Sequence, residues 1–516
     1  MPTDSGPLSR REALGLGLLL ASTTACTGSK AVEVEEVPLH VLRRMLQNRE
    51  ITARALTQAY LNRISKVDQL THAVIEINPD ALRIAEELDR AEVQSGPLHG
   101  IPILLKDNID TGDRMMTTAG SLALEGPPAS EDSGVARRLR VAGAVILGKT
   151  NLSEWANIRS SRSTSGWSGR GGLTHNPYAL DRNCSGSSSG SGAAAAASLC
   201  AAAVGTETDG SIVSPSSING LVGIKPTVGL LSGKGIIPIS HTQDTAGPMA
   251  RSVRDAAIML AAMQEPREGM PSDYLRYLED QGLRGARIGV ARQFWGTHSD
   301  IVKIANEAIG VMKRLGAEVV DEVKLDTTPM YGEAEFDVMM YELKTDLNAY
   351  LATRQGLQVK TLSDVIEFNN RNATHEMPYF AQENFLKARE KGDLKSKAYL
   401  EALEKCRKLS RTDGIDAVLA KYKLDAIFSI TDGPAWLTDY INGDHFTGGC
   451  STPPAVAGYP HITVPGGFVY GLPVGVSFFG TAWTEAKLIR YAYSFEQATK
   501  ARRKPGYVPS VRVGGV

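Results

Sequence analysis

The sequence predicts an α/β fold built on a largely parallel sheet, and three observations support this. Short apolar runs of strand length recur from about Gly100 onward, and segments with helical spacing of apolar residues separate them. The composition, with 42% hydrophobic and 22% charged residues, is that of a globular protein. Strands that alternate with helices favour parallel pairing, because a parallel connection needs a crossover, which is usually a helix.

The predicted elements follow one another in a simple order. Residues from Leu39 to about Val93 carry apolar side chains at helical spacing, so this segment is expected to be helical. The charged segment 333–423 is expected to be mostly helical as well. The remaining expected elements are strand 101–105, helix 135–141, strand 144–147, an alanine-rich helix 193–203, strand 288–291 and strand 426–430.

Residues 1–26 have the features of a twin-arginine export signal. Arg10 and Arg11 precede an uncharged run, residues 13–25, which is too short to span a bilayer. The run ends at Cys26 after small residues, as at a lipoprotein cleavage site, although Thr23 stands where such sites usually have leucine. Residues 27–38 are expected to form a linker. We expect an exported protein that is periplasmic or anchored outside the cytoplasm by a lipid at Cys26. The alternative is a disordered N-terminus with a chance Arg-Arg pair.

Charge and cysteine content exclude several classes of protein. The 56 basic and 57 acidic residues give a net charge of -1, so no polyanion-binding surface is implied and nucleic acid is not expected as a partner. The 5 cysteines are irregularly spaced in a long chain, which does not indicate a disulfide scaffold. The 9 histidines are scattered and no His-Glu-x-x-His motif occurs, so no metal site is expected.

Two stretches rich in serine and glycine, residues 183–198 and 205–217, carry the strongest chemical signal. Glycine lets the backbone approach a substrate closely, and serine is a potential nucleophile. Upstream, the predicted strand 101–105 ends on Lys106, where burial would lower the lysine pKa and make it a base. Lys149 and Lys225 also follow apolar stretches, so Lys106 is the first of three candidates on the residues alone. The pattern indicates a hydrolase without a catalytic histidine.

A different nucleophile is suggested by residues 186–190. Gly186-Ser187-Ser188-Ser189-Gly190 matches the nucleophile elbow of α/β-hydrolases, which would make Ser188 the nucleophile. An elbow follows directly on a buried strand, whereas residues 176–182 are turn-like. This alternative is therefore disfavoured.

Taken together, several segments resemble the amidase signature family. They are SGSSSG at 185–190, GTETDGSI at 205–212, INGLVGIKPTVG at 218–229, DTAGPMARSVRDAA at 244–257, AGYPHITVPGGF at 457–468 and GLPVGVSFFG at 471–480. The similarity runs from about Leu39 to Ala501, so we expect an amidase domain over residues 39–510. The resemblance implies a single large domain with a mixed, largely parallel sheet and helices on both faces.

The resemblance also assigns roles. The nucleophile falls on Ser211, the bridging serine after a cis peptide on Ser187, and the lysine on Lys106. The candidate oxyanion hole is formed by backbone N–H groups of Thr208, Asp209, Gly210 and Ser211, and Ser188 is a supporting hydroxyl. Ser185 and Ser189 replace glycines of the common core, a form that peptide-amidase-like members of the family show. Glu207 and Asp209 are expected to orient the loop by hydrogen bonding. No cofactor is implied.

The implied function is hydrolysis of a carboxamide through an acyl-enzyme on Ser211. Residues 159–183 resemble the segment that precedes the serine-rich core in peptide amidases, which suggests C-terminal peptide amides as substrates. A helical cap over about 330–447, with Tyr379, Phe380 and Trp436, could hold an extended ligand. The alternatives are a broad small-amide or aryl acylamidase, transamidation within a tRNA-dependent amidotransferase, and a non-catalytic binding protein.

Overall fold

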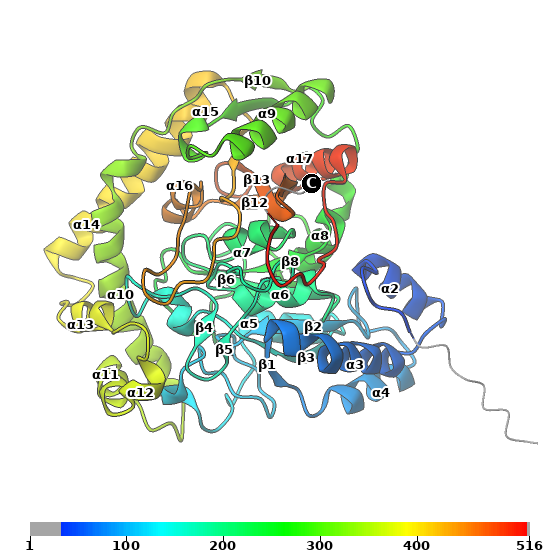
Figure 1. The fold of residues 1–516 in the computed structure, drawn as a ribbon, viewed down its shortest axis with the longest axis vertical. Coiled ribbons are helices and arrows are strands. Elements are labelled where there is room, and N and C mark those ends of the chain that lie inside the picture. Colours follow the sequence, from blue (N-terminus) through cyan, green and yellow to red (C-terminus); the bar gives the residue numbers. More distant parts are fainter. Residues whose placement is uncertain (1–31, 513–516) are drawn as a thin grey trace, which may run out of the picture. The chain divides into compact units, whose positions relative to one another are not determined.

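An 11-stranded sheet, with strands drawn from residues 74 to 479, forms the centre of the fold (Figure 1). The computed structural model describes residues 32–512, so the predicted export signal, including Arg10, Arg11 and Cys26, lies outside the described residues. Residues from Val34 onward form one compact unit. In sheet order the strands are β1 (Val74–Ile77), β3 (Val145–Thr150), β2 (Pro102–Lys106), β6 (Ala202–Glu207), β8 (Thr245–Ala250), β7 (Val222–Lys225), β12 (His461–Val469), β13 (Leu472–Phe479), β11 (Ala426–Ile430), β9 (Arg287–Val290) and β10 (Glu318–Val320).

The helices are distributed along the whole of this unit. Their bounds are α2 (Leu39–Gln47), α3 (Ala53–Thr71), α4 (Ala81–Arg90), α5 (Gly134–Val141), α6 (Ser189–Ala196), α7 (Val213–Ile218), α8 (Val253–Met263), α9 (Ser299–Arg314), α10 (Gly332–Thr353), α11 (Leu362–Arg371), α12 (Ala373–Glu376), α13 (Glu383–Arg389), α14 (Lys397–Arg407), α15 (Asp416–Tyr422), α16 (Thr452–Val456) and α17 (Glu485–Thr499). The smaller elements are a two-stranded ladder of β4 (Trp167–Ser168) and β5 (Gly172–Leu173), a π-helical turn η6 (Lys408–Ile415), and the 3-10 turns η1 (Leu122–Leu124), η2 (Glu154–Asn157), η3 (Leu275–Tyr277), η4 (Arg292–Phe294) and η5 (Thr328–Met330).

Helices pack on the sheet in two connected series. Helix α8 contacts both α5 and α17, while α6 contacts α7, and each series also contacts sheet strands. Helices α10 to α14 lie together along one side of the picture, away from α3 and α4 (Figure 1). The predicted single α/β domain with a mixed sheet is confirmed.

The share of parallel pairs is smaller than predicted. Four neighbouring pairs are parallel and six are antiparallel. The physical reason lies in the middle of the sheet. There β12 and β13 form a hairpin, and β7 and β8 pair with antiparallel neighbours, so helical crossovers do not connect these strands.

Two other expectations are corrected. The segment from Leu39 to Val93 is not helical throughout. Strand β1 lies between α3 and α4 in this segment and pairs with β3. The alanine-rich helix ends at Ala196 rather than 203, because Ser198 has a left-handed φ of 57° and Ala202 already belongs to β6. Pairing of β6 between β2 and β8 overrides the helical preference of its alanines.

Helix α6 packs closely against the segments that contain Ala73 and Asn151, so small residues are required there. All eight residues of α6 are buried. A Cβ on Gly190 would lie 2.4 Å from the carbonyl oxygens of Ala73 and Asn151. Such contacts are too short for any side chain, so glycine at 190 lets the serine-rich segment sit directly against the ends of the strands.

Candidate active site

The three residues that the sequence singled out come from three adjoining segments. Lys106 is the last residue of β2, Ser187 lies two residues before α6, and Ser211 follows β6. Strands β2 and β6 are parallel neighbours. Their carboxyl ends therefore lie at the same edge of the sheet, which is where α/β folds place binding and catalytic groups.

Lys106 is fully buried and hydrogen-bonds to Ser187. Its Nζ lies 2.7 Å from the Oγ of Ser187, 2.9 Å from the Oγ1 of Thr206 and 3.2 Å from the Thr206 carbonyl oxygen. Burial lowers the pKa of Lys106 to about 7, although the charges of Asp244 and Glu207 oppose this. A lysine with such a pKa is partly neutral near pH 7 and can accept a proton.

The two other candidate lysines lie elsewhere. Lys149 donates to the carbonyls of Ile109 and Met116 and to the hydroxyl of Thr117. Lys225 donates to the carbonyl of Pro226. Neither forms a hydrogen bond with Ser187 or Ser211 in the described part of the chain, so Lys106 is the lysine that the fold brings to Ser187.

The segment that carries Ser187 is held on both sides. The Gly186–Ser187 peptide bond is cis, as the resemblance implied. Ser188 accepts a hydrogen bond from the Thr206 N–H and donates one to its carbonyl, which fixes the segment against β6. Ser189 donates to the carbonyl of Ser185 at 2.6 Å. These contacts join Ser188 to β6, and its supporting role in the site stays a prediction.

The turn after β6 exposes backbone donors. Gly210 has a φ of +81°, which glycine adopts without steric cost. The N–H groups of Asp209, Gly210 and Ser211 donate no hydrogen bond within residues 32–512. Those of Ile212 and Val213 both donate to the carboxylate of Glu207. Glu207 therefore orients the loop, as expected, and leaves three unpaired donors beside Ser211.

Ser211 opens into a cavity of about 610 Å³, which we call the Ser211 cavity. Its hydroxyl forms no hydrogen bond within the described residues, and 8% of the residue is exposed. The ionisable side chains of the lining are Asp209 and Asp432. The Asp209 carboxylate accepts a hydrogen bond of 2.7 Å from Thr452. The full lining is Ala156, Asn157, Gly186, Asp209, Gly210, Ser211, Ser214, Gln293, Phe294, Gly296, Thr431, Asp432, Phe446, Gly448, Gly449, Ser451 and Thr452.

Asp432 and two serine hydroxyl groups form a hydrogen-bonded series beside the site. Ser214 donates to its carboxylate, and the hydroxyls of Ser214 and Ser185 lie 2.8 Å apart. Burial raises the pKa of Asp432 to about 7. Through Ser214, the Ser185 hydroxyl therefore joins the segment before Ser187 to Asp432, which follows strand β11.

The sequence did not point to Thr206, Asn108 or Asp432. Asn108 donates to the Thr206 Oγ1 at 2.9 Å, so the hydroxyl that contacts Lys106 is itself held. Thr206 lies within the quoted segment 205–212, and its position five residues before Ser211 was the available signal. Asp432 and Asn108 are brought in by tertiary packing alone.

The three aromatic residues expected in a cap, Tyr379, Phe380 and Trp436, differ in their exposure and in their contacts. Tyr379 is 44% exposed and stacks on Tyr440 with ring centroids 3.9 Å apart. Phe380 is buried under the guanidinium of Arg159. Trp436 is buried against Phe446, which lines the Ser211 cavity. Strand β11, inside the range 330–447, belongs to the central sheet.

A buried charge network joins the helical segment to the site. Arg159 is fully buried and pairs with Glu154 at 2.9 Å. It also donates to the carbonyl of Glu376 in α12 at 2.8 Å. The Glu376 carboxylate accepts hydrogen bonds from Ser121 and from the N–H of Leu122.

Among the described residues, one group combines histidine and carboxylates with ligand atoms within 4.8 Å of one another, namely His241, Glu342 and Asp346. Its members already bind one another, with His241 2.8 Å from Asp346. No helix within residues 32–512 has the length and hydropathy needed to cross a membrane.

The fold and the site define an α/β protein with a lysine–serine pair at the carboxyl ends of its parallel strands. The family model Amidase matches residues 55–489. A probable amidase from Arabidopsis thaliana is 39% identical over 502 residues, which cover 93% of this chain and 93% of that protein.

Two solved structures are similar over nearly the whole chain. The native peptide amidase from Stenotrophomonas maltophilia has 47% identity and a TM-score of 0.87, with 92% of this chain and 99% of that chain covered. The peptide amidase PAM in complex with the competitive inhibitor chymostatin has 47% identity and a TM-score of 0.89, with the same coverage. The chain belongs to the amidase family, and its activity is that of an amide hydrolase.

Proposed function

We propose that the protein hydrolyses primary carboxamides, above all the C-terminal amides of peptides, with Ser211 as nucleophile and Ser187 and Lys106 as its proton relay. One observation carries this proposal. A fully buried lysine with a pKa of about 7 lies 2.7 Å from a serine hydroxyl at the edge of the sheet. A buried base in contact with a hydroxyl, beside a second hydroxyl on unpaired backbone donors, is suited to acyl transfer.

The hydrogen bonds of Lys106 set the direction of proton flow. A neutral amine has two N–H groups and one lone pair. Thr206 offers two acceptors, its carbonyl and its Oγ1, which take the two N–H groups. The lone pair is then directed at Ser187, so Ser187 donates its proton to Lys106 and can accept the proton of Ser211.

In the acylation step, the Ser211 Oγ attacks the carbonyl carbon of the amide as its proton passes to Ser187. The unpaired N–H groups of Asp209, Gly210 and Ser211 are the proposed oxyanion hole, together with that of Thr208. Removal of one such donor typically costs about a hundredfold or more in rate. The C–N bond then breaks, the nitrogen takes a proton from Ser187, and ammonia leaves.

In the deacylation step, water attacks the acyl-enzyme and gives its proton to the same relay. The products are a carboxylic acid and free Ser211, so the catalyst is restored without a cofactor. The buried carboxylates Asp209 and Asp432 line the cavity that holds the acyl group. Burial raises the pKa of both groups, so their repulsion of the acid product's carboxylate, which promotes its release, grows with pH as they ionise.

The substrate is tested by comparing two amides. The kcat/KM for a dipeptide amide is measured against that for benzamide, with ammonia release as the readout. A peptide amidase prefers the dipeptide amide by more than about tenfold, or about 1.4 kcal/mol in transition-state binding. A smaller preference supports the broad small-amide or aryl acylamidase instead, and no ammonia from either amide supports a non-catalytic binding protein.

We also propose that the enzyme acts outside the cytoplasm, where it meets extracellular peptides. This rests on the sequence features of residues 1–26, and a lipid anchor at Cys26 is part of the same proposal.

A further inference from the structure

The segment 208–211, which we call the oxyanion loop, is held by a carboxylate on each side. Beyond Ser211, the Glu207 carboxylate accepts hydrogen bonds from two backbone N–H groups. At the start of the loop, the Oγ1 of Thr208 donates a hydrogen bond of 2.6 Å to the Oδ1 of Asp244. This bond attaches the first residue of the oxyanion loop to a side chain that the catalytic steps above do not use.

Asp244 is itself fixed by the turn 239–244 that precedes strand β8. Its Oδ2 accepts hydrogen bonds of 2.8 Å from the N–H of Ile239 and 2.9 Å from the N–H of Ser240. Hydrogen bonds to an ionised carboxylate are stronger than those between neutral groups. Asp244 therefore has a fixed orientation, and the Thr208 hydroxyl binds to a rigid acceptor.

The residue before Asp244 makes a second contact with the oxyanion loop. The Nε2 of Gln243 donates to the carbonyl oxygen of Thr208 at 3.4 Å and to the carboxylate of Glu335 in α10 at 3.1 Å. The turn 239–244 thus contacts both the side chain and the backbone of Thr208, and it joins them to helix α10.

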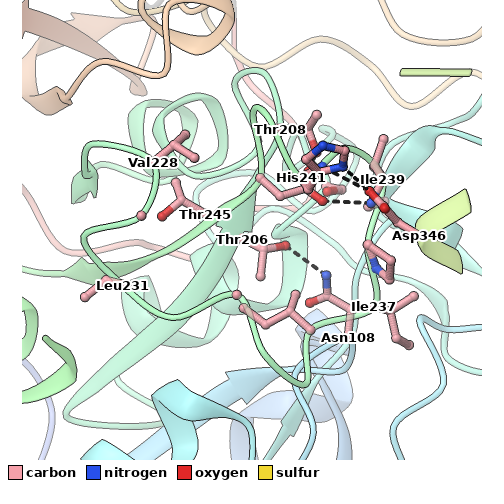
Figure 2. Close-up of a pocket in the computed structure, with 17 residues that line it drawn as sticks. Asn108, Thr206, Thr208, Val228, Leu231, Ile237, Ile239, His241, Thr245 and Asp346 are labelled. Carbon is pink, nitrogen blue, oxygen red and sulfur yellow. Dashed lines mark hydrogen bonds and ion pairs between the residues drawn. The ribbon is translucent and has the colours of Figure 1, made fainter. Parts of the chain in front are cut away.

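A cavity of about 260 Å³ places Asp244 near the proton relay. Its lining includes Asp244, Ser187 and Thr206. The last two are hydrogen-bond partners of Lys106, and the dashed line in Figure 2 marks the bond from Asn108 to Thr206. Asp244 therefore faces the same cavity as the groups that contact the base.

We propose that Asp244 is a positioning residue for acyl transfer, which fixes the oxyanion loop through Thr208 and supplies a negative charge near Lys106. This inference rests on the proposed function. The unpaired N–H groups of the loop must point to the position of the oxyanion before it forms, because preorganised donors act most strongly on the transition state. A loop that is held less firmly is therefore expected to lower kcat rather than to raise KM.

The charge of Asp244 acts on the base. Burial raises the pKa of Asp244 to about 6, so this group is largely ionised at pH 7. Burial lowers the pKa of Lys106, and the charges of Asp244 and Glu207 oppose this effect. Acylation leaves a proton on Lys106, so a negative charge nearby favours this step.

Other ionisable groups surround this pair. Burial and, to a smaller extent, the charge of Asp346 in α10 raise the pKa of Asp244. His241 lies 2.8 Å from Asp346, and this hydrogen bond raises the pKa of His241. On the side of β6, burial raises the pKa of Glu207 and the charge of Lys225 lowers it. The variants below leave His241, Asp346, Glu207 and Lys225 unchanged.

Two substitutions separate the hydrogen bond from the charge. Thr208→Val removes the hydroxyl and keeps the carboxylate, and Thr208→Ser restores the hydroxyl. Asp244→Asn removes the charge and keeps the shape, because the amide oxygen accepts from the two N–H groups while the amide nitrogen donates to the Thr208 hydroxyl. The readouts are kcat and KM for ammonia release from N-acetylphenylalanine amide, and the pH profile of kcat/KM. Circular dichroism checks folding, and Thr208→Ala replaces a valine variant that does not fold.

Asp68 provides a matched control, because its carboxylate makes the same set of hydrogen bonds. It accepts a hydrogen bond of 2.7 Å from the Oγ1 of Thr71 and one each from the N–H groups of Ala73 and Val74. Neither Asp68 nor Thr71 lines the Ser211 cavity or the cavity beside Ser187. Asp68→Asn and Thr71→Val therefore make the same chemical changes outside the site.

Thr208→Val is expected to lower kcat by about tenfold or more and to change KM by less than about twofold, and Thr208→Ser to recover most of the rate. Asp244→Asn is expected to move the midpoint of the pH profile to lower pH by about one pH unit, because loss of the negative charge lowers the pKa of Lys106. Asp68→Asn and Thr71→Val should keep the wild-type kcat and pH midpoint.

Four results overturn the inference. A wild-type kcat in Thr208→Val would show that the hydroxyl does not fix the loop. A pH midpoint in Asp244→Asn that is unchanged or higher would show that its charge does not act on the base. Equal losses in the site variants and the Asp68 and Thr71 controls would assign the effect to stability. In these three cases ammonia release by the wild-type enzyme leaves the proposed function standing, whereas a wild-type enzyme that releases no ammonia refutes both.

Discussion

The backbone N–H of Ser188 donates a hydrogen bond of 3.2 Å to the carbonyl oxygen of Ser211. This contact joins the two serine-rich segments directly, one on each side of the site. The side chain of Ser188 also holds Thr206. Ser188, which the elbow motif would make the nucleophile, thus joins Ser211 to strand β6 by hydrogen bonds.

Ser211→Ala is expected to lower kcat by at least about a thousandfold, because the nucleophile is lost while a small side chain on a loop leaves the fold intact. A sulfonyl fluoride should label Ser211 in the wild-type enzyme, as identified by mass spectrometry of the digest. An unchanged circular dichroism spectrum is the control for folding. A label on Ser188 would show that the elbow, and not the relay from Lys106, supplies the nucleophile.

Activity is expected to rise with pH through about 7. Burial lowers the pKa of Lys106 to about 7, and only the neutral amine accepts a proton, so the active fraction grows as pH increases. The measurement is kcat/KM for a primary amide between about pH 5 and 9. Lys106→Ala should be inactive across this range. A flat wild-type profile would mean that no group with this pKa limits the reaction.

Thr206→Val is expected to lower kcat by about tenfold to a hundredfold with little change in KM. The valine removes the hydroxyl that takes one N–H of Lys106, so the lone pair is no longer directed at Ser187. Thr206→Ser keeps the hydroxyl and should restore most of the rate. If valine and serine variants behave alike, the hydroxyl has no part in orienting the lysine.

Gly190→Ala is expected to destabilise the protein by about 1–3 kcal/mol, because its Cβ meets two carbonyl oxygens that cannot move apart. Each lies 2.4 Å from the Cβ position. Thermal unfolding of the variant is compared with that of Gly332→Ala, whose Cβ meets no atom within 4 Å. Equal melting temperatures for the two variants would contradict the close packing of α6.

The double variant Arg10→Lys with Arg11→Lys is expected to remain in the cytoplasm, because the paired arginines are the proposed export address. Cell fractionation with an activity assay measures this. Cys26→Ser should move the exported enzyme from the membrane to the soluble fraction. Normal export of the double variant would refute the proposed twin-arginine address.

Local patterns predicted part of this structure well. Strand β11 (Ala426–Ile430) has the predicted bounds, because a short buried apolar run between polar turns has few other ways to fold. Motifs predicted Lys106, Ser187 and Ser211 as site residues, and the pairing of β2 with β6 brings the segments of Lys106 and Ser211 to one edge of the sheet.

The remainder depends on contacts between distant residues. Periodicity shows that a strand exists but does not give the direction of its neighbour, so the antiparallel centre of the sheet was missed. Asp432 reaches Ser214 and Asn108 reaches Thr206 only because the chain folds back on itself. A single sequence carries no local signal for such pairs.

The bond of Arg159 to Glu154 and to α12 limits how this enzyme can be rebuilt. The helical segment cannot be treated as an exchangeable module, because Glu154 and Arg159 stay behind in the catalytic unit while their neighbour Glu376 would leave with the insert. Arg159 keeps its ion pair with Glu154 but loses the backbone carbonyl that accepts its hydrogen bond, and a hydrogen bond to a charged group contributes about 1.5–3 kcal/mol. A chimaera that imports this segment from a relative must therefore place a backbone carbonyl where that of Glu376 now accepts a hydrogen bond from Arg159.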